Sequence, residues 1–225
     1  MGEFWIRAVA AAAIAYFCGC FNGAVIVSKY ILRDDVRTHG SGNAGLTNFY
    51  RTFGGPLTFG VILTDVLKAI VALVVGGWLL VGHLPAGLPG PQEAYSDYWA
   101  GLFCLLGHMF PCMFQFKGGK GIACSFGMII ALFPQCLPLC VLIFVLAVAI
   151  TRYVSLGSIL AALGLMVQIW IFGAKGWLAF ATSDLLEAQI LVSFACILAI
   201  VLHRGNIKRL LAGNENKFSF KSKRD

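Results

Sequence analysis

Residues 56–82 read PLTFGVILTDVLKAIVALVVGGWLLVG, an apolar run interrupted by two charged side chains, Asp65 and Lys68. A helix of about 20 residues crosses the hydrocarbon core of a bilayer, so this run predicts a transmembrane helix. The rest of the chain has the same character: 59% of its 225 residues are hydrophobic and 12% are charged. A soluble domain carries about 25% charged residues, and disordered chains are far less apolar. Both classes are therefore excluded, and eight cysteines are too few for a secreted disulfide scaffold.

Six further apolar stretches flank this run, and each is a candidate span. They are residues 5–29, 98–114, 121–135, 137–151, 156–174 and 188–203. We expect an all-α integral membrane protein, a compact bundle of about seven transmembrane helices that forms a single domain over residues 1–225. Residues 83–97 are predicted to form a loop. Pro134 and Pro138 leave two alternatives open for residues 121–151, two short spans or one broken helix.

The basic residues predict the orientation of these spans. If successive spans alternate in direction, most Lys and Arg side chains fall on one side of the membrane. They are Lys29, Arg33, Arg37, Arg51, Lys117, Lys120, Arg152, Arg204, Lys208, Arg209, Lys217, Lys221, Lys223 and Arg224. The positive-inside rule makes this side cytoplasmic, which places the N-terminus outside and the C-terminus in the cytoplasm. Membrane lipids are the expected partners of much of this charge, and charges spread over short loops exclude nucleic-acid binding.

Three polar stretches lie on this predicted cytoplasmic side, and the first is GSGNAGLTNFYR at residues 40–51. Its three glycines allow backbone N–H groups to approach a ligand closely. Ser41, Asn43, Thr47 and Asn48 add polar groups, and Arg51 can grip a phosphate through two parallel hydrogen bonds. The alternative is a flexible interfacial turn that caps the following span.

The second stretch, GHMFPCMFQFKGGKG, covers residues 107–121. A glycine-rich turn that opens a helix directs several N–H groups and the positive end of the helix dipole at one point, which suits an anion. We expect Lys117, Gly118, Gly119, Lys120 and Gly121 to bind substrate. The stretch is not a Walker A motif, so nucleotide hydrolysis is disfavoured. His108 is either a packing residue or part of this site.

The third stretch, HRGNIKRLLAGNE, covers residues 203–215 after the last span. On a helix, His203, Asn206 and Ile207 share one face while Lys208 points elsewhere. The alternative is a basic helix that lies on lipid headgroups. Within the span at 56–82, Asp65 and Lys68 are three residues apart and are predicted to form an ion pair.

Signatures of metal and covalent chemistry are missing from the sequence. The four histidines share no metal-ligand spacing, and neither an HEXXH motif nor a GxSxG nucleophile elbow occurs. The cysteines fall almost entirely in apolar stretches and are predicted to be packing residues. We therefore expect no metal and no cofactor.

In order along the chain, the three stretches resemble the acyl-phosphate:glycerol-3-phosphate acyltransferase family, the bacterial PlsY type. That family shows GSGNxGATNxxR, GHxFPxFxxFKGGKG and HRxNIxRLxxGxE. The departures here are Leu46 for Ala, Ala69 for Gly and Cys124 for Thr. None of them removes a polar group from a predicted site.

The resemblance implies a reaction: an acyl group passes from acyl phosphate to the 1-hydroxyl of glycerol 3-phosphate, giving lysophosphatidic acid and phosphate. The residues fit this reaction, because both substrates carry phosphate and two glycine-rich basic stretches are present. An acyl phosphate is already activated, so no covalent acyl-enzyme is needed. The HxxxxD motif of thioester-dependent acyltransferases is absent. The resemblance also implies the bacterial cytoplasmic (inner) membrane, with an active site that faces the cytoplasm.

Two sets of site residues are predicted. The catalytic set is Ser41, Asn43, Asn48, His203 and Asn206. The substrate-binding set is Thr47, Arg51, His108, Lys117, Gly118, Gly119, Lys120, Gly121, Arg204 and Glu215. The expected partners are acyl phosphate, glycerol 3-phosphate and membrane lipids, with the chain acting as a monomer. The alternative function is a membrane transporter or channel for a small phosphate-bearing anion, but its polar residues would be strung through several spans.

Overall fold

The structure, a computed structural model, describes residues 2–81, 95–178 and 185–219. The chain forms two compact units, divided between Leu132 and Phe133. Most of the predicted loop at 83–97 lies outside the described residues. The same holds for the predicted cytoplasmic charges Lys221, Lys223 and Arg224.

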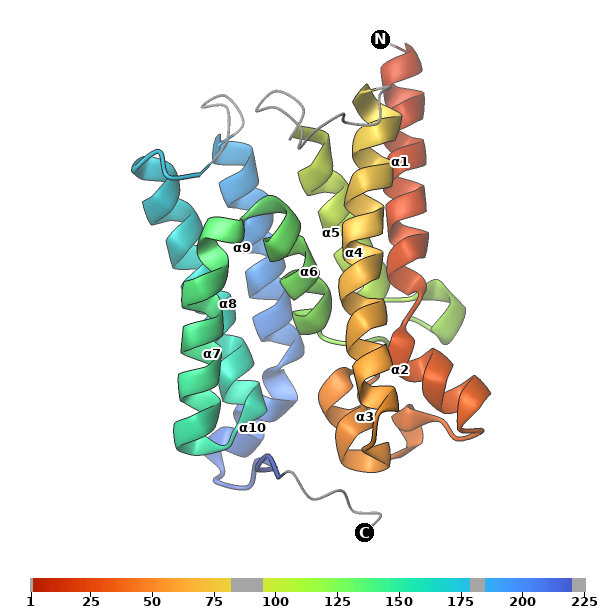
Figure 1. The fold of residues 1–225 in the computed structure, drawn as a ribbon, viewed down its shortest axis with the longest axis vertical. Coiled ribbons are helices and arrows are strands. Elements are labelled where there is room, and N and C mark those ends of the chain that lie inside the picture. The colour runs from red at the N-terminus through yellow and green to blue at the C-terminus, as the bar shows by residue number, and fades with distance from the viewer. Residues whose placement is uncertain (1, 82–94, 179–184, 220–225) are drawn as a thin grey trace. The chain divides into compact units, whose positions relative to one another are not determined.

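The first unit is built from helices that run alongside one another (Figure 1). Its α-helices are α1 (Gly2–Cys20), α2 (Gly23–Ile26), α3 (Leu46–Phe53), α4 (Leu57–Val81), α5 (Tyr95–Met109) and α6 (Ile122–Leu132). A π-helical turn (Val27–Ile31) and two 3-10 turns (Val36–Thr38 and Cys112–Phe114) complete it. Helix α4 packs against α1, α5 and α6, so the predicted span at 56–82 is the centre of this unit.

Helices α1 and α5 approach each other at two reciprocal glycine contacts. A Cβ added to Gly19 of α1 would collide with the backbone of Cys104 in α5. A Cβ added to Gly107 of α5 would collide in turn with the backbone of Tyr16 in α1. Small residues at helix crossings are typical of membrane proteins, because they let two backbones come close.

The second unit contains α7 (Leu137–Thr151), α8 (Val154–Ala174), α9 (Leu185–Leu202) and α10 (Arg204–Leu211). Helix α8 packs against both α7 and α9. Arg152, with φ +63°, ends α7 and turns the chain into α8. Its guanidinium donates to the carbonyl of Phe218, and Phe218 N–H donates to the carbonyl of Arg152, which ties the tail to this turn.

Within the described residues, four helical segments are long and apolar enough to cross a membrane. They are Leu57–Leu79, Pro134–Thr151, Val154–Ala174 and Leu185–Leu202. A fifth candidate is the pair Trp5–Cys20 and Gly23–Ile31, which is bent by 44° at a break. Two apolar helices are shorter, Tyr98–Phe114 and Ile122–Leu132. The fold is thus an all-α membrane protein.

The structure interrupts one predicted span, and for residues 121–151 it shows where the helices begin and end. The run at 5–29 is interrupted at Phe21 and Asn22, where Asn22 Oδ1 caps α2 by accepting from Val25 N–H at 3.0 Å. For residues 121–151, the structure has two separate helices, α6 and α7, with Phe133 and a 3-10 turn (Pro134–Cys136) between them. Two prolines close to this break explain why a continuous helix does not form.

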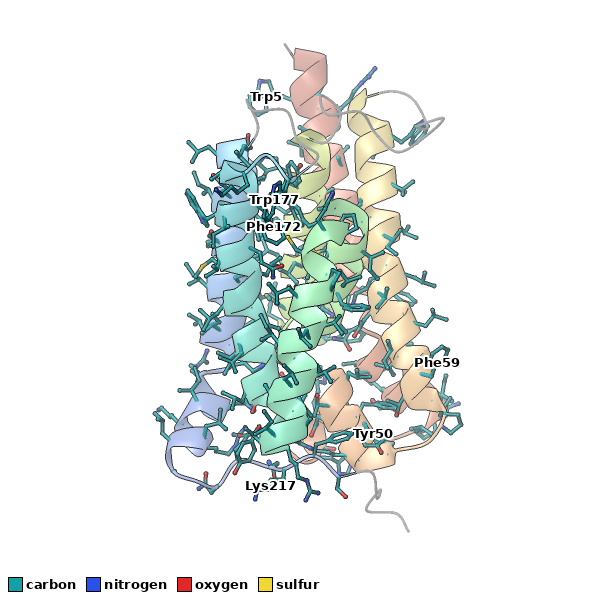
Figure 2. All side chains as sticks on the ribbon, turned by 60° about the vertical axis from the view of Figure 1, so that its left-hand side comes forward. Trp5, Tyr50, Phe59, Phe172, Trp177 and Lys217 are labelled. Carbon is teal, nitrogen blue, oxygen red and sulfur yellow. The ribbon has the colours of Figure 1, made fainter. Side chains whose placement is uncertain are left out.

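Aromatic side chains lie toward the ends of both units, with Trp5, Phe59 and Trp177 exposed and Tyr50 and Phe172 half-buried (Figure 2). In the first unit, Trp5 lies at one end, and Tyr50 and Phe59 lie toward the other. In the second, Trp177 stacks edge-on against Phe172 at the end opposite Lys217. Trp and Tyr concentrate at the two interfaces of a bilayer, so the positions of Trp5, Tyr50 and Trp177 fit spans that cross it.

Candidate functional site

The first polar stretch is a loop followed by a short helix, and not a loop throughout. Residues 39–45 are irregular, and α3 begins at Leu46. Ser41 and Asn43 therefore lie in the loop, whereas Thr47, Asn48 and Arg51 lie on α3. The interpretation of the whole stretch as a flexible turn was wrong, because apolar side chains inside it anchor α3 to the unit. They belong to a buried cluster of Ala24, Val25, Val36, Ala44, Phe49, Phe53, Val61 and Phe114.

Asn48 holds the loop in place. Its side-chain Oδ1 accepts a hydrogen bond from Ser41 N–H at 2.9 Å. Its Nδ2 donates to the carbonyls of Val36 at 2.9 Å and His39 at 3.0 Å. The side chain is buried. The loop closes tightly around this amide, since a Cβ added to Gly40, which has φ +56°, would collide with Asn48 Oδ1.

Asn22, at the break between α1 and α2, holds the same loop from the other side. Its Nδ2 donates to the carbonyl of Ala44 at 3.0 Å, and the residue is fully buried. Sequence reasoning missed Asn22. The available signal was an amide side chain in the middle of an apolar run, next to a glycine.

The second polar stretch forms a glycine loop, residues 118–121, that leads into α6 as predicted. The loop lies on the end of α5, because Gly118 N–H donates to the carbonyl of Met109 and Gly119 N–H donates to the carbonyl of His108. Gly121 has φ +88°, which favours glycine at this position. Lys117 is exposed and Lys120 is half-buried.

The two loops touch within the first unit. A Cβ placed on Gly119 would lie 3.2 Å from the carbonyl oxygen of Ala44. Arg37, in the 3-10 turn just before the first stretch, reaches the second stretch, since its Nη1 donates to the carbonyl of Phe114 at 3.0 Å. The rest of the guanidinium binds the Asp35 carboxylate, with Nη2 and Oδ2 2.7 Å apart. This hydrogen bonding lowers the pKa of Asp35 and raises that of Arg37. Asp35 and Arg37 were not predicted to belong to the site.

A buried trio of ionisable side chains, Asp65, Lys68 and His108, lies next to the glycine loop. Lys68 Nζ donates to Asp65 Oδ1 at 2.8 Å, so the predicted ion pair is confirmed. The same ammonium lies 2.8 Å from Nδ1 of His108. All three side chains are buried. The third member could not be predicted, because only the packing of α4 against α5 brings residue 108 next to residue 68.

The third polar stretch belongs to the second unit. Its helix α10 follows a break at His203, and the predicted helix face is confirmed, with His203 and Asn206 buried and Lys208 exposed. Glu215 is buried as well and holds this end of the unit together. Its Oε1 accepts from Asn206 Nδ2 at 2.9 Å and its Oε2 from Arg209 Nε at 2.7 Å. Arg204 is exposed.

An apolar groove of about 550 Å³ lies between α1 and α4 of the first unit. Its lining is almost wholly apolar, and its polar residues are Thr64 and Lys68. Among the described residues, no group of three His, Cys, Asp or Glu side chains could hold a metal ion. Ser41, Asn43, Thr47, Asn48, Arg51, His108 and residues 117–121 thus share the first unit, whereas His203, Arg204, Asn206 and Glu215 lie in the second.

Comparison with known proteins gives one consistent result. Residues 9–213 match a family model described as glycerol-3-phosphate acyltransferase. A glycerol-3-phosphate acyltransferase of Thermoanaerobacter pseudethanolicus is 39% identical, over 96% of this chain and 98% of the relative. One from Clostridioides difficile is 38% identical, over 93% of this chain and 95% of the relative.

Two solved structures are also similar. Both are of PlsY (YgiH), described as an integral membrane glycerol 3-phosphate acyltransferase. The glycerol 3-phosphate form has a TM-score of 0.78 and 28% identity, over 94% of this chain and 96% of that chain. The lysophosphatidic acid form has a TM-score of 0.75 and 28% identity, over 95% of this chain and 96% of that chain.

Proposed function

Because the chain belongs to the glycerol-3-phosphate acyltransferase family, we propose that it transfers a fatty acyl group from acyl phosphate to the 1-hydroxyl of glycerol 3-phosphate. The products are lysophosphatidic acid and inorganic phosphate. The observation that carries this proposal is the contact between the two glycine-rich loops at Gly119 and Ala44. This contact brings the backbone of the glycine loop, a predicted phosphate site, next to the backbone of the polar loop at residues 39–45. The family match also favours an enzyme over the transporter alternative.

The chemistry proceeds in one displacement, without an acyl-enzyme. The 1-hydroxyl oxygen attacks the acyl carbon, a new C–O bond forms, and the bond from that carbon to the phosphate oxygen breaks. The hydroxyl proton passes to the departing phosphate. The enzyme has to orient the hydroxyl and stabilise the oxyanion and the leaving phosphate, which positioned N–H groups and cations can do.

The residues divide between the two substrates as follows. The glycine loop at residues 118–121 binds the phosphate of the acyl donor, with Lys120 adding charge and Lys117 lying beside it. The amides of Gly118 and Gly119 support this loop, because they donate to the carbonyls of Met109 and His108. Ser41 and Arg51 bind glycerol 3-phosphate, and Asn43 and Thr47 orient its hydroxyl or the donor carbonyl. Asn48 acts through the loop that it holds, because its amide is committed to Ser41, Val36 and His39.

The third polar stretch is assigned on the family pattern that it matches. His203 and Asn206 serve the glycerol 3-phosphate side, with Arg204 as a further cation. Glu215 fixes Asn206, as their hydrogen bond indicates. The match of the family model over residues 9–213 spans both units and supports one acyltransferase domain over residues 1–225.

The proposed topology is seven spans, with the N-terminus outside and the C-terminus and active site on the cytoplasmic side of the bacterial inner membrane. The four long apolar segments, the bent pair and the two shorter apolar helices support seven. The basic residues of the connecting segments support the orientation. The groove between α1 and α4 opens among apolar side chains and suits an acyl chain. A monomer is sufficient for this scheme.

The test uses purified protein in detergent with palmitoyl phosphate and glycerol 3-phosphate. We expect lysophosphatidate and phosphate to appear in equal amounts, with no labelled protein when the acyl group is radioactive. Palmitoyl-coenzyme A should not replace the donor. Lys120→Ala and Arg51→Ala should each abolish transfer, whereas Lys29→Ala, which removes an exposed charge elsewhere in the first unit, should not. Full activity of both site variants would contradict the assignment.

A further inference from the structure

The buried trio of Asp65, Lys68 and His108 connects α1, α4 and α5 at a single ammonium group. Lys68 Nζ donates to Asp65 Oδ1 at 2.8 Å and to the carbonyl of Phe21 at 3.1 Å. It also lies 2.8 Å from His108 Nδ1. Phe21 follows α1 at its break, where backbone carbonyls lose their helical partners. An ammonium has three N–H donors, and all three are used here.

This arrangement fixes the state of His108. An ammonium can only donate, so Nδ1 of His108 must accept and the ring proton lies on Nε2. Asp65 Oδ2 makes no hydrogen bond with the described part of the chain, so the carboxylate acts mainly on Lys68. His108 Nδ1 is 3.6 Å from Asp65 Oδ1, beyond hydrogen-bond distance. The ring is therefore held by Lys68.

The Nε2–Cε1 edge of the ring lies against the glycine loop. A Cβ placed on Gly119 would collide with Nε2 and Cε1 of His108. The carbonyl of His108 accepts from Gly119 N–H at 3.1 Å, and that of Met109 accepts from Gly118 N–H at 3.2 Å. The loop thus lies directly on the ring and the backbone at the end of α5. A rotation of the ring would move Gly119.

We propose that Asp65 and Lys68 are positioning residues for the phosphate-binding loop, acting through His108. Neither is expected to contact the phosphate of the substrate, although Lys68 also lines the groove proposed for the acyl chain. Lys68 sets the orientation of the His108 ring, and the ring with its carbonyl sets the direction of the amides at Gly118 to Gly121. The assignment of this loop to the phosphate of the acyl donor rests on the proposed function. The inference that Lys68 positions the loop through His108 does not depend on which ligand the loop binds.

The experiment compares wild-type protein with Lys68→Met, which is one atom shorter, keeps an unbranched side chain and removes its donors. Hydrogen exchange at the amides of Gly118 and Gly119, measured in detergent without substrate, should accelerate about tenfold, the worth of roughly one charge-assisted hydrogen bond. Hydrogen exchange at the amides of α4 and α5 themselves should stay at wild-type rates. In turnover assays, the KM for palmitoyl phosphate should rise by about the same factor. The KM for glycerol 3-phosphate should not change.

The matched control is Leu63→Met, a neighbouring change at an exposed position of α4 that does not line the groove between α1 and α4. If Lys68→Met does not fold, His108→Asn serves instead, because it keeps an acceptor near Nδ1 and removes the ring edge at Gly119. Wild-type exchange at Gly118 and Gly119 in a folded variant would overturn the proposal. Uniformly faster exchange along α4 and α5 would also overturn it, as a merely structural role predicts. Absence of turnover in the wild type would refute the proposed function, and the exchange result would still decide this inference.

Discussion

Arg37 Nη1 donates a hydrogen bond of 3.0 Å to the backbone carbonyl of Phe114, which lies 77 residues further along the chain. Its guanidinium carbon also lies 5.6 Å from the centre of the Phe114 ring. One side chain therefore joins the 3-10 turn that leads into the polar loop (Val36–Thr38) to the turn that precedes the glycine loop. A cation over an aromatic face adds to the strength of this link.

Arg37→Ala should separate the two stretches. We expect a loss of about 1–3 kcal/mol in unfolding free energy, since a half-buried charge-assisted bond is removed. Catalytic efficiency should fall by about tenfold or more for the same reason. The control is Arg33→Asn, which removes a nearby exposed charge and suits the positive φ of residue 33. Equal activity of the two variants would contradict the bridging role.

Asp35 gives the link a dependence on pH. Hydrogen bonding to Arg37 lowers the pKa of its carboxyl group, so the stabilisation is full above the ordinary pKa of about 3.9 and is lost as the pH falls through the lowered value. Asp35→Asn should therefore be less stable than wild type at pH 7, by about 1 kcal/mol. The difference should vanish at strongly acid pH. Thermal unfolding in detergent across this range measures it, and a difference independent of pH would refute the linkage.

Asn48→Ala should release the polar loop, because three hydrogen bonds depend on one buried amide. We expect a cost of about 2–3 kcal/mol, since buried backbone groups lose their partners. Transfer activity should also fall, because the loop that carries Ser41 is no longer held in position. Thr52→Ala on the same helix removes a hydroxyl that, within the described residues, donates to the Asn48 carbonyl, and it should cost less than about 0.5 kcal/mol. Chemical unfolding and turnover assays on both variants distinguish the two effects.

Gly119→Ala should displace the glycine loop from His108, because the new Cβ collides with the ring. The KM for the acyl donor should rise by at least about tenfold, as for a lost phosphate contact. Gly60→Ala on α4 is the control, since a Cβ there meets nothing within 4 Å. It should be neutral or stabilise α4 by about 0.5–1 kcal/mol. An unchanged KM in Gly119→Ala would show that the loop tolerates a side chain.

The sequence was sufficient for the helical membrane class and for the glycine loop before α6, because long apolar runs and glycine clusters are local signals. It also predicted the Asp65–Lys68 pair, since the two residues share one helix face. It was not sufficient for the contacts of His108, Arg37 and Asn22. These depend on which helices pack together, and a spacing of 40 or 77 residues carries no periodic signal.

Helix α3 shows a different limitation. With eight residues and a glycine at each end, it is too short for propensity to indicate a helix. It forms because Phe49 and Phe53 are buried in the cluster with Val25 and Val61. Tertiary packing therefore decided that Thr47, Asn48 and Arg51 lie on a helix.

The reciprocal glycine contacts of α1 and α5 have a consequence for the response to the bilayer. Gly19 and Gly107 each receive the backbone of the other helix, so neither helix can slide along its partner without a clash. When a span is mismatched to the membrane thickness, tilting is one of the available adjustments. In this protein α1 and α5 must tilt together as one rigid pair. The height of His108 relative to the Phe21 carbonyl then stays constant in thick and thin membranes alike.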